Sequence, residues 1–455
     1  MLNALARQIL RRPGVYFLAL LIALAAPARA ALPAGDIVVT ANISTGDTGL
    51  VLIDPATGNR SILSDNAHGT GMPFSQPLGV SVTANGDLLV TDMGFPSGPM
   101  PVSVDGLTPP PPPPTPARVY LVDPSTGNRT VLSQDSMTDT IPPYAAIGSG
   151  TMFNGPVIAR QVGNQILMTD SSVGAGSSLM TIDPSTGNRA VISGRLLPGG
   201  LQVSGSTAFV ADEFEGLLSV DLATGNRTII SGKSAGSGPA FNTAADVATY
   251  GGQLLVSGGN TTDFSTFGIY RIDPTTGNRT MVSTSTVGTG PIDPGGTLLL
   301  AVEPGGTILA STLNSSLGLL AVDPTTGNRT ILSDATHGAG PTFTSLNDVA
   351  VVPLPGDANG DGMVNGLDIN AVAAQWNHTG YFLMGDTNGD GMVNGLDINA
   401  VALHWQQHDI GVGRGGIGGG GLGGGAGGIS AVPEPSTSIM AAFGGLALLL
   451  WRRAH

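Results

Sequence analysis

The sequence predicts a mainly β fold followed by a small α-helical module. Two repeats support this prediction. A turn motif occurs six times between residues 54 and 329, and the stretch at residues 359–373 occurs again, letter for letter, at residues 388–402. The composition agrees, because 69 Gly and 33 Pro residues with only 11% charged residues favour turn-rich β-structure.

The charge pattern excludes one class of partner. The formal net charge is −14 and Lys233 is the single lysine, so no basic surface can neutralise a phosphate backbone. We therefore expect no nucleic acid partner. Cys is absent, so no disulfide stabilises the chain, and stability has to come from packing or from bound metal.

The first 30 residues have the pattern of an export signal. Arg7, Arg11 and Arg12 precede the apolar run "VYFLALLIALAAP", and "ARA" follows it as a small-x-small cleavage pattern. The apolar run is shorter than the roughly 20 residues of a membrane-spanning helix. We predict a signal peptide over residues 1–30, removed after Ala30.

The body of the chain, residues 35–353, contains the six copies of the turn motif. The copies read D-x-x-T-G-N-R and begin at Asp54, Asp123, Asp183, Asp221, Asp273 and Asp323. Asp opens a turn, Gly and Asn tolerate a left-handed backbone, and β-branched residues flank each copy, so each copy is predicted to be a hairpin. Two further strand candidates lie upstream of most copies. Four strands per unit, at intervals of 38 to 69 residues, indicate the blades of a β-propeller.

The first of these units lacks an innermost strand. It begins with "DIVVTAN" (36–42), which aligns with the second strand of later units, whereas "LNDVAVVP" (346–353) has no blade of its own. We therefore expect residues 346–352 to complete the first blade and to close a six-bladed propeller without free sheet edges. The pattern resembles the NHL and gluconolactonase-like propellers, and this resemblance implies architecture only.

The propeller offers two sets of candidate site residues besides the repeated turns. Six equivalent turns around a ring indicate turn chemistry, so their Asp and Arg residues are interpreted as structural. The first set lies in two similar blade-to-blade links and consists of His68 with Asp65 and His337 with Asp334; it forms either a ligand or weak metal site or a loop shape repeated by duplication. The second set is a group of acids that could supply a hydrolase pair: Asp212, Glu213, Glu215 and Glu303.

The duplicated stretch has the spacing of a calcium-binding loop. Oxygen-bearing residues fall at loop positions 1, 3, 5, 9 and 12, a main-chain carbonyl is expected at position 7, and Gly at position 6 permits the sharp bend. The predicted ligands are Asp357, Asn359, Asp361, Met363, Asn365 and Asp368 in the first loop, and Asp386, Asn388, Asp390, Met392, Asn394 and Asp397 in the second. Oxygen ligands without His or Cys favour calcium, so we expect two Ca²⁺ ions.

Each loop leads into one helix with an apolar face, which contains Ile369, Val372, Ala373 and Trp376 in the first copy. The loop-helix duplication over residues 356–409, with Asp at position 12, resembles the type I dockerin module. That resemblance implies calcium binding and a cohesin-like partner contacted by positions 10 and 11, here Gly366, Leu367, Gly395 and Leu396. Gly at position 10 departs from the family pattern. Two equal faces suit docking in two orientations; a calcium-stabilised cap without a partner is the other interpretation.

The C-terminal segment is expected to be a linker followed by a sorting signal. Residues 410–431 include the Gly-rich run "GVGRGGIGGGGLGGGAGG", which is typical of a flexible tether. Residues 432–455 join "VPEPST", a short apolar membrane segment from Ile439 to Trp451, and the basic pair Arg452 and Arg453. This tail resembles the PEP-CTERM sorting signal of Gram-negative bacteria, which implies transient holding in the inner membrane, processing by an exosortase-type enzyme and delivery to the cell surface or matrix.

These features together predict an exported, surface-directed calcium-binding protein. It would act as a binding or matrix component through one propeller face and a dockerin-like docking module, with a polysaccharide or matrix ligand. The alternative is an extracellular glycoside hydrolase or lyase delivered by its dockerin-like module. The sequence contains no nucleophile motif or unique acid pair that favours the enzyme.

Overall fold

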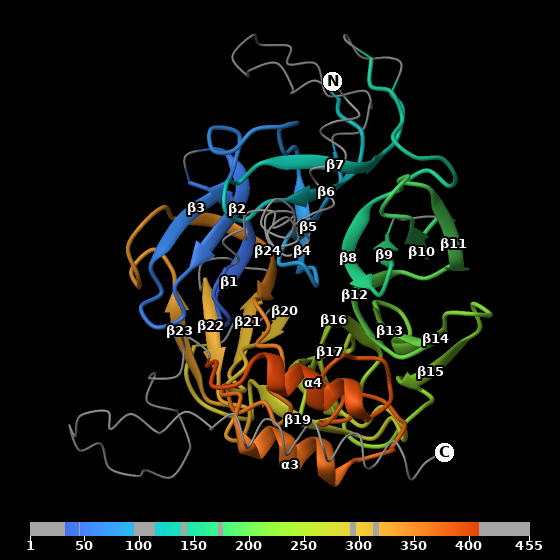
Figure 1. Cartoon of the computed structure of the whole chain (residues 1–455), viewed down its shortest axis with the longest axis vertical. Coiled ribbons are helices and arrows are strands. Elements are labelled where there is room, and N and C mark those ends of the chain that lie inside the picture. The colour runs from blue at the N-terminus through green and yellow to red at the C-terminus, as the bar shows by residue number, and fades with distance from the viewer. Residues whose placement is uncertain are drawn as a thin grey trace, which may run out of the picture.

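The computed structural model describes residues 32–44, 46–94, 114–137, 143–171, 176–291, 297–312 and 318–408. The predicted signal peptide, linker and sorting signal lie outside these residues. Within them, 24 strands form six four-stranded antiparallel sheets, and two short helices follow near the end (Figure 1). The predicted mainly β fold with a small helical module is confirmed.

Each sheet is one blade of a propeller. From the axis outward, blade 1 has β24 (Phe343–Val351), β1 (Ile37–Ile43), β2 (Thr48–Ile53) and β3 (Arg60–Ser64); blade 2 has β4 (Pro77–Val82), β5 (Leu88–Asp92), β6 (Arg118–Val122) and β7 (Arg129–Gln134); blade 3 has β8 (Pro156–Val162), β9 (Gln165–Asp170), β10 (Ser178–Ile182) and β11 (Arg189–Gly194). Blade 4 has β12 (Pro198–Ser204), β13 (Thr207–Asp212), β14 (Gly216–Asp221) and β15 (Arg227–Ser231); blade 5 has β16 (Thr243–Tyr250), β17 (Gln253–Asn260), β18 (Asp263–Ile272) and β19 (Arg279–Thr284); blade 6 has β20 (Thr297–Val302), β21 (Ile308–Thr312), β22 (Leu319–Val322) and β23 (Arg329–Ser333).

The ring is closed by the last strand. The innermost strands contact one another in the order β24, β4, β8, β12, β16 and β20, and β20 contacts β24. β24 pairs antiparallel with β1, from Ile37 opposite Val351 to Ile43 opposite Phe343. The predicted closing strand is therefore confirmed, although it begins at Phe343 rather than at residue 346, because two irregularities in register let the pairing continue to Ile43.

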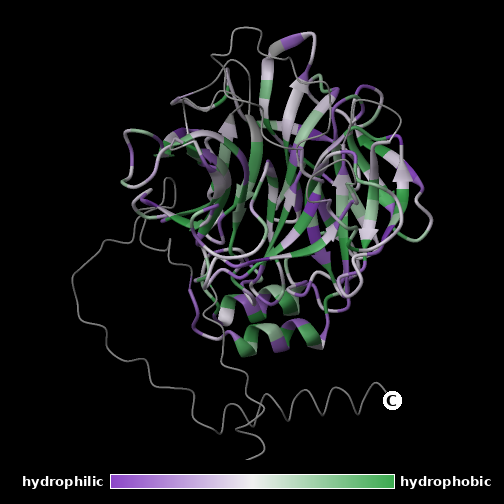
Figure 2. Cartoon of the chain, turned by 90° about the horizontal axis from the view of Figure 1, so that it is seen from above, coloured by the Kyte–Doolittle hydropathy of each residue, from purple (hydrophilic) through white to green (hydrophobic). Residues whose placement is uncertain are grey.

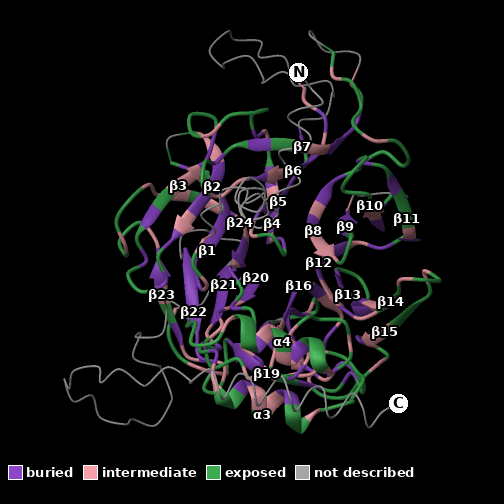
Figure 3. Ribbon diagram, in the orientation of Figure 1, coloured by how far each residue is buried: buried purple, intermediate pink, exposed green. Residues whose placement is uncertain are grey.

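The core consists of six apolar clusters, one between each pair of neighbouring blades. Side chains alternate along each strand, so the two faces of one blade supply two clusters. In β1, Ile37 and Val39 pack toward blade 6, whereas Val38 packs toward blade 2. Figure 3 shows the resulting burial along the strands of every blade.

The repeated turns join neighbouring blades. Within each copy the Asp accepts hydrogen bonds from its own turn, as Asp54 does from the amides of Ala56 and Thr57 at 2.8 and 2.9 Å. In five copies the Arg reaches back to a serine that is the last or last but one residue of the outer strand of the preceding blade. The five Arg–Ser pairs are Arg60–Ser333, Arg129–Ser64, Arg189–Ser133, Arg279–Ser231 and Arg329–Ser283. These contacts show that the motif forms the predicted turns and links neighbouring blades.

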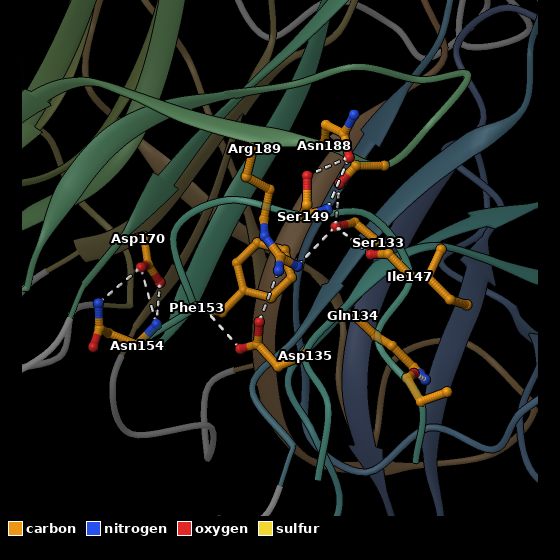
Figure 4. A network of polar contacts seen from close by, with 12 residues as sticks. Ser133, Gln134, Asp135, Ile147, Ser149, Phe153, Asn154, Asp170, Asn188 and Arg189 are labelled. Carbon is orange, nitrogen blue, oxygen red and sulfur yellow. Dashed lines mark hydrogen bonds and ion pairs between the residues drawn. The ribbon is translucent and has the colours of Figure 1, made fainter.

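Figure 4 shows one of these junctions in detail. Arg189 donates to Ser133 Oγ at 2.9 Å, forms an ion pair with Asp135 at 3.0 Å, and lies 4.4 Å above the ring centroid of Phe153. Asn188 accepts hydrogen bonds from the amide and the hydroxyl of Ser149 at 2.8 Å each. Every polar residue of the turn therefore bonds either its own turn or the preceding link.

The junction between blades 3 and 4 is different. The link between β11 and β12 has only three residues, and Arg227 is exposed. Its Nη1 donates to the carbonyls of Gly194 and Arg195 at 2.6 and 3.0 Å, not to a serine hydroxyl.

The two helices lie side by side outside the ring on one face of the propeller (Figure 2). They are α3 (Gly366–Ala374) and α4 (Gly395–Leu403). Val364, Val372, Val393 and Val401 form their small core. The predicted apolar face is partly wrong, because α3 ends at Ala374, Ala373 is exposed, and Trp376 lies beyond the helix with 37% of its surface exposed.

Candidate metal centre

The first residue of each loop holds the bend. Asp357 Oδ1 accepts a hydrogen bond from the amide of Gly360 at 2.8 Å, and its Oδ2 accepts one from Gly362 at 2.9 Å. Gly362 has φ +82°, a left-handed backbone that favours glycine. The second loop repeats this arrangement, with Asp386 Oδ2 accepting from Gly391 at 2.7 Å.

Positions 3 and 5 order the rest of the bend in the same way. In the first loop the Asn359 and Asp361 side chains accept from the amides of Asp361 and Met363, each at 2.9 Å. In the second loop Asn388 and Asp390 accept from Asp390 and Met392 at 2.9 and 2.8 Å. Identical sequence therefore gives nearly identical geometry in the two loops, which include all twelve predicted ligand residues.

Position 12 has a second role that the ligand spacing did not indicate. Asp368 is fully buried; its Oδ1 accepts from the Ala358 amide at 2.8 Å and its Oδ2 from the Asn365 amide at 2.7 Å. Asn365 is the N-cap of α3 and accepts from Leu367 at 2.8 Å, so positions 9 and 12 form a capping box. Asn394 and Asp397 do the same for α4. The N-x-x-D spacing ahead of each helix is the signal that could have predicted this role.

The carboxylates of each loop are close enough to repel one another. Burial, with smaller contributions from the charges of Asp368 and Asp361, raises the pKa of Asp357 to about 6. Burial and the charges of Asp397 and Asp390 also raise the pKa of Asp386. A divalent cation would relieve this repulsion. Among the described residues no three His, Cys, Asp or Glu side chains are grouped to hold a metal, so the fit rests on the mixed carboxylate, amide and main-chain oxygens that calcium prefers.

The two repeats brace each other. The chain after α4 pairs with the first loop, where the Val364 amide donates to Gln407 O and Val364 O accepts from Gln406, both at 2.8 Å. The chain after α3 pairs with the second loop, where the Asn377 amide donates to Val393 O at 2.9 Å and Val393 donates to His378 O at 3.0 Å. Neither repeat is therefore complete without the other.

Two glycines allow this close packing. A Cβ on Gly356, just before the first loop, would lie 2.9 Å from Ala400 O and 3.0 Å from Val401 Cα of α4. A Cβ on Gly385, just before the second loop, would lie 2.8 Å from Val372 Cα of α3. Each loop thus begins against the helix of the other repeat.

The predicted partner-binding positions face outward. Leu367 and Leu396 expose 56% and 61% of their surfaces, and Gly366 and Gly395 beside them are exposed. Leu403 of α4 is 70% exposed. Both helices therefore present apolar side chains to solvent. Figure 3 shows exposed segments on α3 and α4.

The acids proposed for a hydrolase pair lie on different faces. Asp212 ends β13, on the side of the second-to-third strand connections, whereas Glu303 follows β20 on the side of the first-to-second strand turns. Asp212 accepts from the amides of Leu197, Phe214 and Glu215, with Glu213 and Glu215 in the same loop. It is also not unique in the sequence, because Asp92 and Asp170 end the second strands of blades 2 and 3 and also bind link amides.

The two histidine links are separate local structures. His68 Nδ1 lies 2.8 Å from Asp65 Oδ1, and His337 Nδ1 lies 2.9 Å from Asp334 Oδ1. In each link the same aspartate also accepts the histidine amide at 2.6 Å. Both links therefore have the same loop shape, which favours duplication over a shared site.

Comparison with known proteins identifies the helical module. The model of the dockerin type I domain family matches residues 355–404, and no curated protein sequence matches the chain. Solved structures similar to this chain include one from a nidogen/laminin complex, at 10% identity over 70% of this chain and 98% of that chain, with a TM-score of 0.46. Others are a structural genomics protein of unknown function from Bacteroides thetaiotaomicron (11% identity, 70% and 78% covered, TM-score 0.43) and a gluconolactonase from Xanthomonas campestris (15% identity, 62% and 84% covered, TM-score 0.36).

The match confirms the dockerin resemblance. Dockerin domains bind calcium, typically dock cohesin partners and imply an extracellular or cell-surface protein. In the part of the chain that the structure describes, no helix is long and apolar enough to span a membrane. Residues 355–404 are a type I dockerin domain, carried by a chain whose main body is a six-bladed β-propeller.

Proposed function

We propose that this chain is an exported, surface-directed calcium-binding protein that docks through its dockerin domain and acts as a binding or matrix component. The observation that carries this proposal is the equal geometry of two loops with oxygen ligands at the same positions. The propeller presents a second face, opposite the dockerin domain, to a polysaccharide or matrix ligand. The export signal at residues 1–30 and the sorting signal at residues 432–455 direct the chain to the surface, with processing by an exosortase-type enzyme.

Each loop holds one calcium ion. The first ion takes Asp357, Asn359, Asp361, the Met363 carbonyl, Asn365 and Asp368; the second takes Asp386, Asn388, Asp390, the Met392 carbonyl, Asn394 and Asp397. The ion supplies the positive charge that offsets the carboxylates of each loop. The loop residues fix the bend, and Asp368 and Asp397 tie each loop to its helix through amide hydrogen bonds. Because the module's apolar core is small, calcium binding should be linked to its folding.

The docking surface consists of Gly366, Leu367, Gly395 and Leu396. The exposed leucines supply apolar contact area, and the flanking glycines let a partner backbone approach closely. Because the two copies are equal, a cohesin-like partner can dock in either of two orientations.

Titration calorimetry of calcium into the chain tests the metal assignment. We expect two ions, with a gain of helix in circular dichroism. Asp361→Ala and Asp390→Ala alter position 5 of identical loops, so each should remove one ion and the double variant both. Absence of binding at millimolar calcium would overturn the assignment, and retention of both ions in either variant would contradict the ligand set.

A further inference from the structure

The segment between the two repeats contacts the propeller. Tyr381 and Phe382, which we call the aromatic latch, pack on Phe209 of β13 with ring centroids 5.1 and 5.2 Å away. Phe209 is fully buried in the cluster between blades 4 and 5, and Phe382 packs against that cluster. The latch therefore joins the dockerin domain to the core of the propeller.

The backbone of the latch is held in an unusual conformation. Phe382 has φ +48°, which is uncommon for any residue except glycine and persists where the surroundings hold it. Its amide donates to Ser204 Oγ at 3.1 Å, at the end of β12. The strained residue is thus fixed by one backbone contact and one ring contact, both with blade 4.

The second calcium loop lies against the same turn of blade 4. The Gly205 amide donates to Gly389 O at 3.4 Å, and a Cβ on Gly205 would lie 3.4 Å from Asp390 O. The Gly380 amide, just before the latch, donates to Gly391 O at 3.1 Å. Loop residues at positions 4 and 6 therefore bond both the propeller turn and the start of the latch.

The contact is asymmetric although the loops are identical. The repeats are offset by 29 residues, from Asp357 to Asp386, so Ile410 and Gly411 stand where the first repeat has Tyr381 and Phe382. The hydrogen bonds from the amides of Gly205 and Gly380 both go to carbonyls of the second loop. The second loop is therefore the one whose shape bears on the contact.

We propose that calcium in the second loop fastens the dockerin domain to blade 4 through the aromatic latch, and that loss of this ion releases the domain from the propeller. This inference rests on the proposed calcium binding. Asp386 accepts from the Gly391 amide at 2.7 Å and carries the same charge as Asp390 and Asp397 in its loop. Without a cation this like charge is not neutralised, and the bend at Gly391 opens. The carbonyls that meet Gly205 and Gly380 then move, and the strained backbone of Phe382 relaxes.

Hydrogen exchange of the whole chain, with calcium and with chelator, tests the proposal. We expect exchange in the turn around Gly205 to be at least about tenfold slower with calcium. The equivalent turn of blade 2, between Val82 and Leu88, should not change. Phe382→Ala and Ser204→Ala remove the contact from opposite sides and should give fast exchange around Gly205 even with calcium. Leu403→Ala, an exposed residue of the same domain, is the matched control.

Calorimetry on the same samples separates the outcomes. If two calcium ions bind but exchange around Gly205 is the same with and without calcium, the latch proposal is overturned while the proposed function stands. If no calcium binds, both proposals fall. If the turn around Gly205 keeps wild-type protection from exchange in both Phe382→Ala and Ser204→Ala with calcium, the latch proposal is also overturned. Loss of this protection in both variants, with two ions bound, supports the proposal.

Discussion

Arg60 of blade 1 donates from Nη1 to Ser333 Oγ of blade 6 at 2.7 Å, across 273 positions of sequence. The same guanidinium donates to the carbonyls of Pro341 and His337 at 2.6 and 2.8 Å and lies 5.4 Å from the ring centroid of Phe343. One side chain therefore links the first outer strand to the last link, at the junction where the ring closes.

Replacement of Arg60 should weaken ring closure. Arg60→Ala leaves the buried Ser333 hydroxyl and three carbonyls, those of His337, Gly338 and Pro341, without this donor, so we expect a loss of about 2 kcal/mol in the free energy of unfolding. Urea unfolding followed by far-ultraviolet circular dichroism measures it. Arg227→Ala is the matched control, because Arg227 occupies the same place in its motif but is exposed. Equal losses of unfolding free energy in the two variants would show that the Arg60 contacts at the closing junction contribute no more stability than those of the exposed Arg227.

Gly385→Ala should destabilise the dockerin domain. The new Cβ would lie 2.8 Å from Val372 Cα and 3.0 Å from Ala371 O, so the repeats would have to separate, at a cost of about 1 to 3 kcal/mol. Trp376 and Trp405 lie in this domain, so thermal unfolding followed by tryptophan fluorescence reports on it.

Gly395→Ala is the control for that experiment. No atom lies within 4 Å of its added Cβ, and Gly395 begins α4. Alanine there should leave stability unchanged or raise it by up to about 1 kcal/mol. A large loss at Gly395, or none at Gly385, would contradict the packing of each loop start on the opposite helix.

Partner docking should depend on both leucines together. If either face of the domain docks, Leu367→Asp and Leu396→Asp should each reduce affinity for a cohesin by only about twofold, because one of two equal modes remains. The double variant should lose binding. Surface plasmon resonance with a panel of cohesin domains in saturating calcium measures this. Complete loss from one single variant would show that one orientation alone is used.

Repetition explains why much of this architecture could be predicted. Six copies of D-x-x-T-G-N-R fixed the number of blades, and the missing inner strand of the first unit left residues 346–352 as the closing strand. Oxygen ligand spacing predicted two bent loops, each followed by a helix, because a bend around a cation constrains alternate residues directly.

The contact between the dockerin domain and the propeller, and the role of the buried acids, depend on residues far apart in sequence, so local patterns do not predict them. Phe382 meets Phe209 across more than 170 positions, and its left-handed backbone contradicts its propensity. Asp92, Asp170 and Asp212 are equivalent because each ends the second strand of its blade, but they stand in different local sequences, so the sequence does not indicate their common place. Each of the three acids accepts a hydrogen bond from an amide in the link that precedes its blade, at Ser75, Gly155 and Leu197.

The inner strands carry two buried acids that should make propeller stability depend on pH. Burial, and then the charge of Asp246, raises the pKa of Asp348 to about 8, and burial raises the pKa of Asp246 to about 6, with Arg160 acting in the opposite direction on both. Asp348 Oδ2 accepts from the Val80 amide at 2.8 Å and Asp246 Oδ2 from Leu300 at 2.7 Å, so both acids tie neighbouring blades together.

Because these pKa values are raised in the folded protein, the propeller should become less stable as the pH rises. Between pH 5 and 8 an aspartate in the unfolded chain has lost its proton, whereas native Asp348 keeps it. The free energy of unfolding that native Asp348 contributes is therefore full at low pH. It falls as the pH rises toward about 8, by up to about 1.4 kcal/mol per pH unit. Asp348→Asn, which keeps an acceptor for the Val80 amide, should flatten this slope, whereas Asp263→Asn, at an exposed position on β18, should not. Urea unfolding of the propeller in saturating calcium, followed by circular dichroism from pH 5 to 8, measures the slope, and an unchanged slope in Asp348→Asn would assign the dependence to other groups.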